Sequence, residues 1–165
     1  MFWRFQSPLT SPLSPGRGEF CKLKGRKKMT IYVDAGCSGN PGPTYYRGLN
    51  RNGILLFDRE FSFGTNNIGE FLAICTGVAY LIERNGGNGS VWSDSKVAIT
   101  WFNNGRIKTT IERNEKSREI FLCVDKAILY LMSKRRYSKF HPLPEVQWWN
   151  TKEKGEIPAD YGLKN

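Results

Sequence analysis

The chain has 165 residues, of which 39% are hydrophobic and 13% aromatic, and its formal net charge is +10. This length suits one domain with a single core, and the hydrophobic content excludes a wholly disordered chain. The positive charge favours a polyanionic partner, and no apolar run approaches the roughly 20 residues that a membrane-spanning helix needs.

The first 28 residues differ in composition from the rest. Ser7 to Gly16 repeats Ser-Pro-Leu and is rich in proline, which prevents regular structure. Seven basic residues precede Met29, so the remainder carries 18 basic and 14 acidic residues and is only mildly basic. We therefore expect residues 1–28 to be a disordered or low-complexity extension and the folded domain to span residues 29–165, and charge alone does not establish nucleic-acid binding.

A β-rich run predicts the first strand at residues 30–34, which leads into the turn Gly39-Asn40-Pro41-Gly42. Two further strands are predicted at 45–57 and 59–63, joined by a tight hairpin near Asp58. A helix follows, capped by Asn66-Asn67, with apolar residues at helical spacing up to Ile82. The glycine-rich segment 85–89 ends this helix.

The second half of the chain alternates strands and helices. Residues 90–93 and 146–149 read as strands, 95–102 and 119–133 as helices, and 106–117 as a loop. A short terminal helix, at most a stub, is expected after the last strand. This order predicts an α/β fold with a mixed five-stranded sheet flanked by helices.

The four cysteines are widely spaced and form no CxxC pair, which argues against a zinc or iron–sulfur site. Cys75 and Cys123 lie within apolar helical patterns, where cysteine usually acts as a small buried hydrophobe. This usage favours a reducing cytoplasm over a disulfide framework.

Four carboxylates occur where strands end or helices begin. Asp34 leaves the first strand, Glu70 opens a helix after Thr65-Asn66-Asn67, Asp94 follows a short strand, and Asp160 lies near the C-terminus. Each acid alone is compatible with a helix cap or a surface charge. Because a small α/β fold brings such positions together, the set predicts a magnesium site.

These motifs resemble type 1 ribonuclease H from about Met29 to the C-terminus. The most specific pieces are Asp34 with Gly39-Asn40-Pro41-Gly42, and Thr65-Asn66-Asn67 followed by Glu70; Asp94-Ser95 falls in the right order. The resemblance implies a ribonuclease H-like fold and hydrolysis of the RNA strand of RNA–DNA hybrids by a two-metal-ion mechanism.

The resemblance also implies a role for each carboxylate. Asp34 would bridge two Mg2+ ions, with Mn2+ as an alternative metal. Glu70 and Asp94 would hold the ion on the leaving-group side, and Asp160 the ion that activates water. Asn150 is a rival for the position of Asp160.

Substrate contacts follow from the same resemblance. The turn would read 2′-hydroxyls in the minor groove, the first helix would bind a DNA phosphate at its start, and one asparagine would enter the minor groove. The residues of the turn are Gly36, Ser38 and Asn40. The phosphate would be bound by Thr65 and Asn67, and the asparagine in the minor groove would be Asn66. The glycines, Asn40 and Pro41 also favour a turn for purely conformational reasons.

The sequence departs from the family pattern in three places. The loop after the last strand, residues 150–155, lacks the usual histidine, and His141 lies before that strand. The segment 105–117 is too short for the basic insertion of many bacterial enzymes. The chain ends five residues after Asp160, which is therefore the most loosely positioned ligand.

Three functions remain open on the sequence. The first is a magnesium-dependent ribonuclease H that acts on RNA–DNA hybrids, as a cytoplasmic monomer without membrane association. The second is a hybrid- or duplex-binding module with weakened or lost cleavage, favoured by the missing histidine and the short terminus. The third is the ribonuclease H domain of a mobile element, or another nuclease with the same fold.

Overall fold

The computed structural model describes residues 26–139 and 143–161, and most of the expected N-terminal extension lies outside this part. The described chain forms a five-stranded sheet in the order β3-β2-β1-β4-β5. The β1–β2 and β2–β3 pairs are antiparallel, whereas β4 runs parallel to both β1 and β5. The strands are β1 Met29–Cys37, β2 Gly42–Asn50, β3 Leu55–Gly64, β4 Gly89–Ser93 and β5 Glu145–Trp148.

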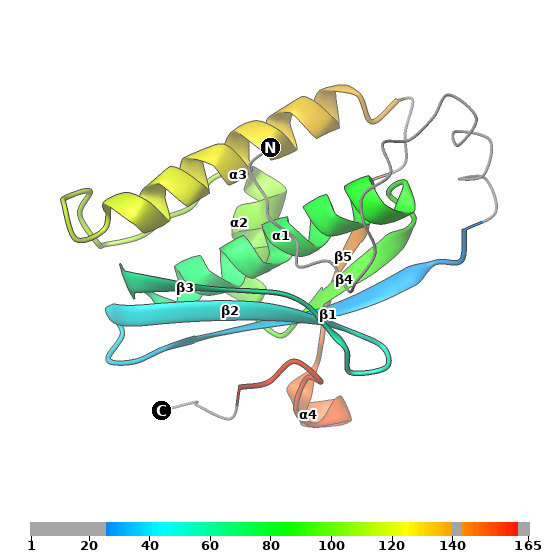
Figure 1. The fold of residues 1–165 in the computed structure, drawn as a ribbon, viewed down its shortest axis with the longest axis horizontal. Helices are drawn as coiled ribbons and strands as arrows, with labels where there is room; N and C mark the ends of the chain where they lie inside the picture. Colours follow the sequence, from blue (N-terminus) through cyan, green and yellow to red (C-terminus); the bar gives the residue numbers. More distant parts are fainter. Residues whose placement is uncertain (1–25, 140–142, 162–165) are drawn as a thin grey trace, which may run out of the picture.

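Helices lie on both faces of this sheet, as Figure 1 shows. The longer helices cover one face, and the short last helix lies on the other with the C-terminal segment. The predicted mixed α/β fold is confirmed. The helices are α1 Asn66–Asn85, α2 Lys96–Asn104, α3 Arg118–Arg136 and α4 Thr151–Lys154.

The central strand β1 sends alternate side chains to the two faces of the sheet. Ile31, Val33 and Ala35 are buried on the face covered by α1. On the opposite face, the Tyr32 ring contacts the Trp149 ring, with centroids 5.6 Å apart. Asp34 shares this second face, so the C-terminal segment covers it.

The predicted hairpin near Asp58 is wrong. The turn lies between β2 and β3 at residues 51–54, where the Asn50 side chain accepts hydrogen bonds from the amides of Asn52 and Ile54 at 2.9 and 3.0 Å. Gly53 supplies the positive φ of 76° that the turn needs. Asp58 instead lies within β3, opposite Arg47.

Helix boundaries differ from the predictions by a few residues. Thr65, not Asn66-Asn67, caps α1, and its hydroxyl accepts from the Ile68 amide at 3.3 Å. The helix ends at Asn85, followed by Gly86 in the left-handed conformation. No helix of the described chain is long and apolar enough to cross a membrane.

The last helix is shorter and earlier than expected. α4 is a single turn at residues 151–154, in the segment expected to be a loop, and Asn150 caps it. The segment 155–161, which holds Asp160, is not helical. Ile157 and Ala159 are buried there, which anchors the segment to the sheet.

We expect Gly42→Ala to destabilise the fold by about 3 kcal/mol, at the upper end of the cost of overpacking. A Cβ at Gly42 would lie 2.0 Å from the Ser38 carbonyl oxygen, a backbone atom of the same tight turn. Gly53→Ala is the control, because a Cβ there meets open space and only the left-handed φ costs about 1 kcal/mol. Denaturant unfolding measures both, and equal losses would contradict the steric argument.

Candidate metal centre

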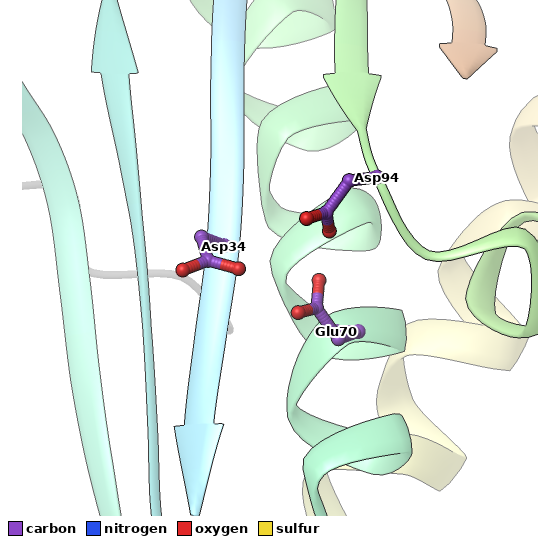
Figure 2. A group of neighbouring side chains, drawn as sticks. All are labelled: Asp34, Glu70 and Asp94. Carbon is purple, nitrogen blue, oxygen red and sulfur yellow. The ribbon is translucent and has the colours of Figure 1, made fainter. Parts of the chain in front are cut away.

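Asp34, Glu70 and Asp94 come together from three elements, as Figure 2 shows. Asp34 lies in β1, Glu70 in the second turn of α1, and Asp94 directly after β4. Each offers a carboxylate oxygen, and these oxygens all lie within 4.8 Å of one another. Three of the four predicted acids therefore form one cluster.

An opening between two parallel strands makes room for this cluster. The ladder between β1 and β4 ends at the pair Tyr32 and Trp92, two residues before each aspartate. Beyond that point, the Ala35 amide donates to Glu70 Oε1 at 3.2 Å instead of to a strand. The Glu70 carboxylate is thus fixed at the carboxyl ends of β1 and β4, where ligands of open α/β sheets usually bind.

Burial makes this cluster electrostatically costly without a cation. Asp34 and Glu70 are only 1% and 3% exposed. Burial, followed by the charges of Asp34 and Asp94, raises the pKa of Glu70 well above its ordinary value. Glu70 Oε2 is buried and has no hydrogen-bond donor among the described residues. Three carboxylates that converge on one point, one of them with a buried oxygen that accepts no hydrogen bond from any described residue, fit a hard divalent cation such as Mg2+.

Metal-free protein should lose stability through Glu70 as pH rises from acid to neutral. The pKa of Glu70 is higher in the folded chain than in the unfolded chain. At pH values between these two pKa values the folded chain binds more protons than the unfolded chain, so the free energy of unfolding falls as the pH rises. Glu70→Gln removes this titration, while its amide oxygen can still accept from the Ala35 amide. The variant should match wild type near pH 4 and melt at a higher temperature at pH 8.

Thermal unfolding in a chelator across this pH range measures the effect. Glu115→Gln is the matched control, because Glu115 is an exposed glutamate in the loop before α3. A Glu70→Gln protein less stable than wild type at pH 8 would contradict the raised pKa.

Asp160 is not one of the three members of this cluster. Its neighbour Tyr161 donates its backbone amide to Asp34 Oδ2 at 3.0 Å, which links the C-terminal segment to the cluster. Asp160 Oδ1 is buried and has no hydrogen-bond donor in the described part of the chain. The prediction that Asp160 lies in a terminal helix is wrong. Asp160 lies in a turn, in which its amide donates a hydrogen bond to the Ile157 carbonyl at 2.9 Å.

The alternative ligand Asn150 has a different task. Its side-chain oxygen accepts from the Lys152 amide at 3.2 Å and caps α4. Lys152, Glu153 and Lys154 all lie exposed in or at the end of this helical turn. His141 lies outside the described residues.

The glycine-rich turn and the start of α1 contact each other. Asn40 Oδ1 accepts from the Asn66 amide at 3.1 Å. Ser38, Asn40 and Asn67 are exposed, so their side chains are available to a ligand. Gly36 leaves no space for a side chain, because a Cβ there would lie 2.4 Å from the Tyr45 ring. Their roles toward substrate stay predictions.

Sequence reasoning missed Arg47 and Tyr161. Arg47 pairs directly with Asp34 across the β1–β2 ladder, so both side chains lie on the second face of the sheet. A charged residue within the predicted strand 45–57 was the available signal. Tyr161 offered none, because its contribution to the cluster comes from a backbone amide.

Two curated proteins are similar to about half of this chain. It is 35% identical over 89 residues to a ribonuclease H of Desulforamulus reducens, which covers 50% of this chain and 52% of that protein. It is 36% identical over 86 residues to a ribonuclease H of Chlorobium phaeovibrioides, and this alignment covers 50% of this chain and 56% of that protein. The alignments thus span about half the length of these relatives. No protein-family model matches the chain.

Solved structures give weaker similarity. An N-terminal RNase H domain from Mycobacterium tuberculosis is 18% identical, with 76% of this chain and 84% of that chain covered and a TM-score of 0.46. An RNase H1 isolated from compost, solved in complex with an RNA/DNA hybrid, is 18% identical, with 78% and 88% covered and a TM-score of 0.43.

Proposed function

We propose that this chain is a type 1 ribonuclease H, an endonuclease that hydrolyses the RNA strand of RNA–DNA hybrids. The observation that carries the proposal is the buried cluster of Asp34, Glu70 and Asp94 at the carboxyl ends of two parallel strands. The similarity to curated ribonucleases H over half the chain supports the same function.

Two Mg2+ ions are the proposed cofactor, with Mn2+ as an alternative. Asp34, Glu70 and Asp94 would hold them together with Asp160, whose buried Oδ1 has no donor within the described chain. Bound divalent ions supply an activated water and neutralise charge on the scissile phosphate.

The chain's own residues would keep the site ready to receive these ions. The Ala35 amide orients the Glu70 carboxylate, and the Tyr161 amide orients that of Asp34. Both amides stabilise the ionised carboxylates that metal binding requires. Because the pKa of Glu70 is raised, its ionisation, which cation binding requires, is less favourable in the metal-free protein than for an exposed glutamate.

The proposed partner is an RNA–DNA hybrid held beside the carboxylates. Gly36, Ser38 and Asn40 would face the 2′-hydroxyls that distinguish RNA from DNA. The start of α1, with Thr65, Asn66 and Asn67, would bind the DNA strand, since free backbone amides at a helix start favour phosphate. The Asn40–Asn66 hydrogen bond would keep these two contact regions in fixed relation.

The proposal includes a monomeric protein that works in the cytoplasm. Cys37, Cys75 and Cys123 are free thiols, which suits a reducing compartment. Burial raises the pKa of Cys75, so this thiol is held protonated in the core.

A cleavage assay tests the function. Purified protein with Mg2+ should cut the RNA strand of a labelled RNA–DNA hybrid and leave duplex DNA and duplex RNA of the same sequence intact. Hybrid binding without cleavage, under Mg2+ and Mn2+, would instead support a binding module. Equal cleavage of duplex RNA would exclude hybrid specificity.

A further inference from the structure

Arg47 lies in β2 and makes three contacts with the C-terminal segment. Its Nε donates to the Ala159 carbonyl at 3.0 Å, and its Nη2 donates to the Asp160 carbonyl at 2.7 Å. Its guanidinium carbon lies 4.2 Å from the centroid of the Tyr161 ring. One planar side chain therefore holds three consecutive residues that lie more than 110 positions away in sequence.

These contacts hold a segment, residues 155–161, that is not helical. Within the segment 155–161 the backbone forms a turn, and the carbonyls of Ala159 and Asp160 accept from the Arg47 side chain. The rigid fork of a guanidinium bonds two carbonyls at once, which the point charge of a lysine does not do as well. The Tyr161 ring also contacts the Tyr45 ring on β2, with centroids 4.9 Å apart.

The same segment reaches the carboxylate cluster through its backbone. Arg47 stands opposite Asp34 in the β1–β2 ladder, and Tyr161 donates its amide to Asp34. Fixing the carbonyl of Asp160 fixes the peptide unit that carries this amide, because the two groups share one planar peptide bond. Arg47 therefore contacts the same peptide unit that donates a hydrogen bond to Asp34.

We propose that Arg47 is a positioning residue that clamps the C-terminal segment, so that Asp160 and the Tyr161 amide are held against the carboxylate cluster. This inference rests on the proposed hydrolytic function for its catalytic consequence, but the clamp itself is a property of the metal-free protein. It predicts that loss of Arg47 loosens residues 159–161 and lowers turnover while hybrid affinity is kept.

The first test measures the clamp without metal or substrate. Amide hydrogen exchange of Tyr161, followed by NMR in a chelator, should be at least about tenfold faster in Arg47→Ala than in wild type. Arg47→Lys should fall between the two, because an ammonium can keep one carbonyl contact. Unchanged Tyr161 exchange in Arg47→Ala would overturn the clamp.

Arg59→Ala is the matched control. Arg59 lies on the neighbouring strand β3, but it pairs with Glu119 of α3 at 3.7 Å and packs on the Phe61 ring, on the other face of the sheet. The Arg59→Ala substitution removes an arginine from the same hairpin and leaves the contacts of the segment 159–161 in place. Tyr161 exchange in Arg59→Ala should equal that of wild type, and an equal acceleration in both variants would reduce Arg47 to a general stabiliser.

The second test measures turnover on a hybrid. Arg47→Ala should lower kcat by at least about tenfold, equivalent to about 1.4 kcal/mol, with KM changed less than about threefold and partial rescue in Arg47→Lys. A raised KM with unchanged kcat would overturn the positioning role. A wild-type protein that cuts no hybrid would refute the proposed function, and the exchange experiment would still decide the clamp.

Discussion

Asp34→Asn should abolish magnesium-dependent cleavage of a hybrid, with a rate loss of at least about a thousandfold, or roughly 4 kcal/mol of barrier. Asp34 is a member of the carboxylate cluster, lies on the central strand β1 and is almost fully buried. The amide is nearly isosteric and its oxygen still accepts from the Tyr161 backbone, so the fold is kept. What the substitution removes is the negative charge that a divalent cation needs.

Hybrid affinity separates lost chemistry from lost binding. Affinity for the hybrid should change little in Asp34→Asn, since phosphate and 2′-hydroxyl contacts supply most of it. Asp125→Asn is the control: Asp125 lies on α3, paired with Arg113 at 2.8 Å, away from the cluster. Retention of more than about a tenth of the wild-type rate in Asp34→Asn, about 1.4 kcal/mol, would refute the assignment.

Asp160→Ala should lower the cleavage rate by at least about a hundredfold, near 2.7 kcal/mol of barrier. The Asp160 carboxylate has a buried oxygen without a donor in the described chain, beside a residue bonded to Asp34. Removing a carboxylate whose buried oxygen has no such donor should not lower the melting temperature of the metal-free protein. A fall in activity without a fall in stability is the signature of a ligand.

Asn150→Ala supplies the comparison, because Asn150 is the rival ligand. Its oxygen caps α4, so its loss should cost about 1 kcal/mol of local helix stability and leave the cleavage rate within a few-fold. Steady-state rates at saturating Mg2+ and thermal unfolding of both variants decide the matter. An active Asp160→Ala together with an inactive Asn150→Ala would assign the fourth position to Asn150.

The clustered carboxylates could be predicted because each stands in a local motif. Asp34 ends a β-branched run before a glycine-rich turn, and Glu70 follows a helix cap. Strand order and helical periodicity then indicate that such sites meet at one sheet edge. Local signals of this kind do not depend on contacts with residues far away in the sequence. The order of the elements and the carboxylate cluster could therefore be predicted from them.

The hairpin and the C-terminal segment could not be predicted in the same way. Apolar and β-forming residues continue on both sides of the turn at Asn50, whose side-chain hydrogen bonds to Asn52 and Ile54 determine where it lies. The position of Asp160 depends on an arginine 113 residues earlier in the chain. No local pattern encodes such a contact, which exists only after the sheet has formed.

The carboxylates belong to chain segments of very different local stability. Glu70 lies in α1, most of which is buried, and Asp34 lies in the central strand. Asp160 instead lies in a C-terminal segment that is held by the buried Ile157 and Ala159, by Arg47 and by the contacts of Tyr161. Peripheral segments open with less free energy than the core that they cover. On heating, the fourth carboxylate should therefore detach before the other three separate, and catalysis should stop while the sheet is still folded.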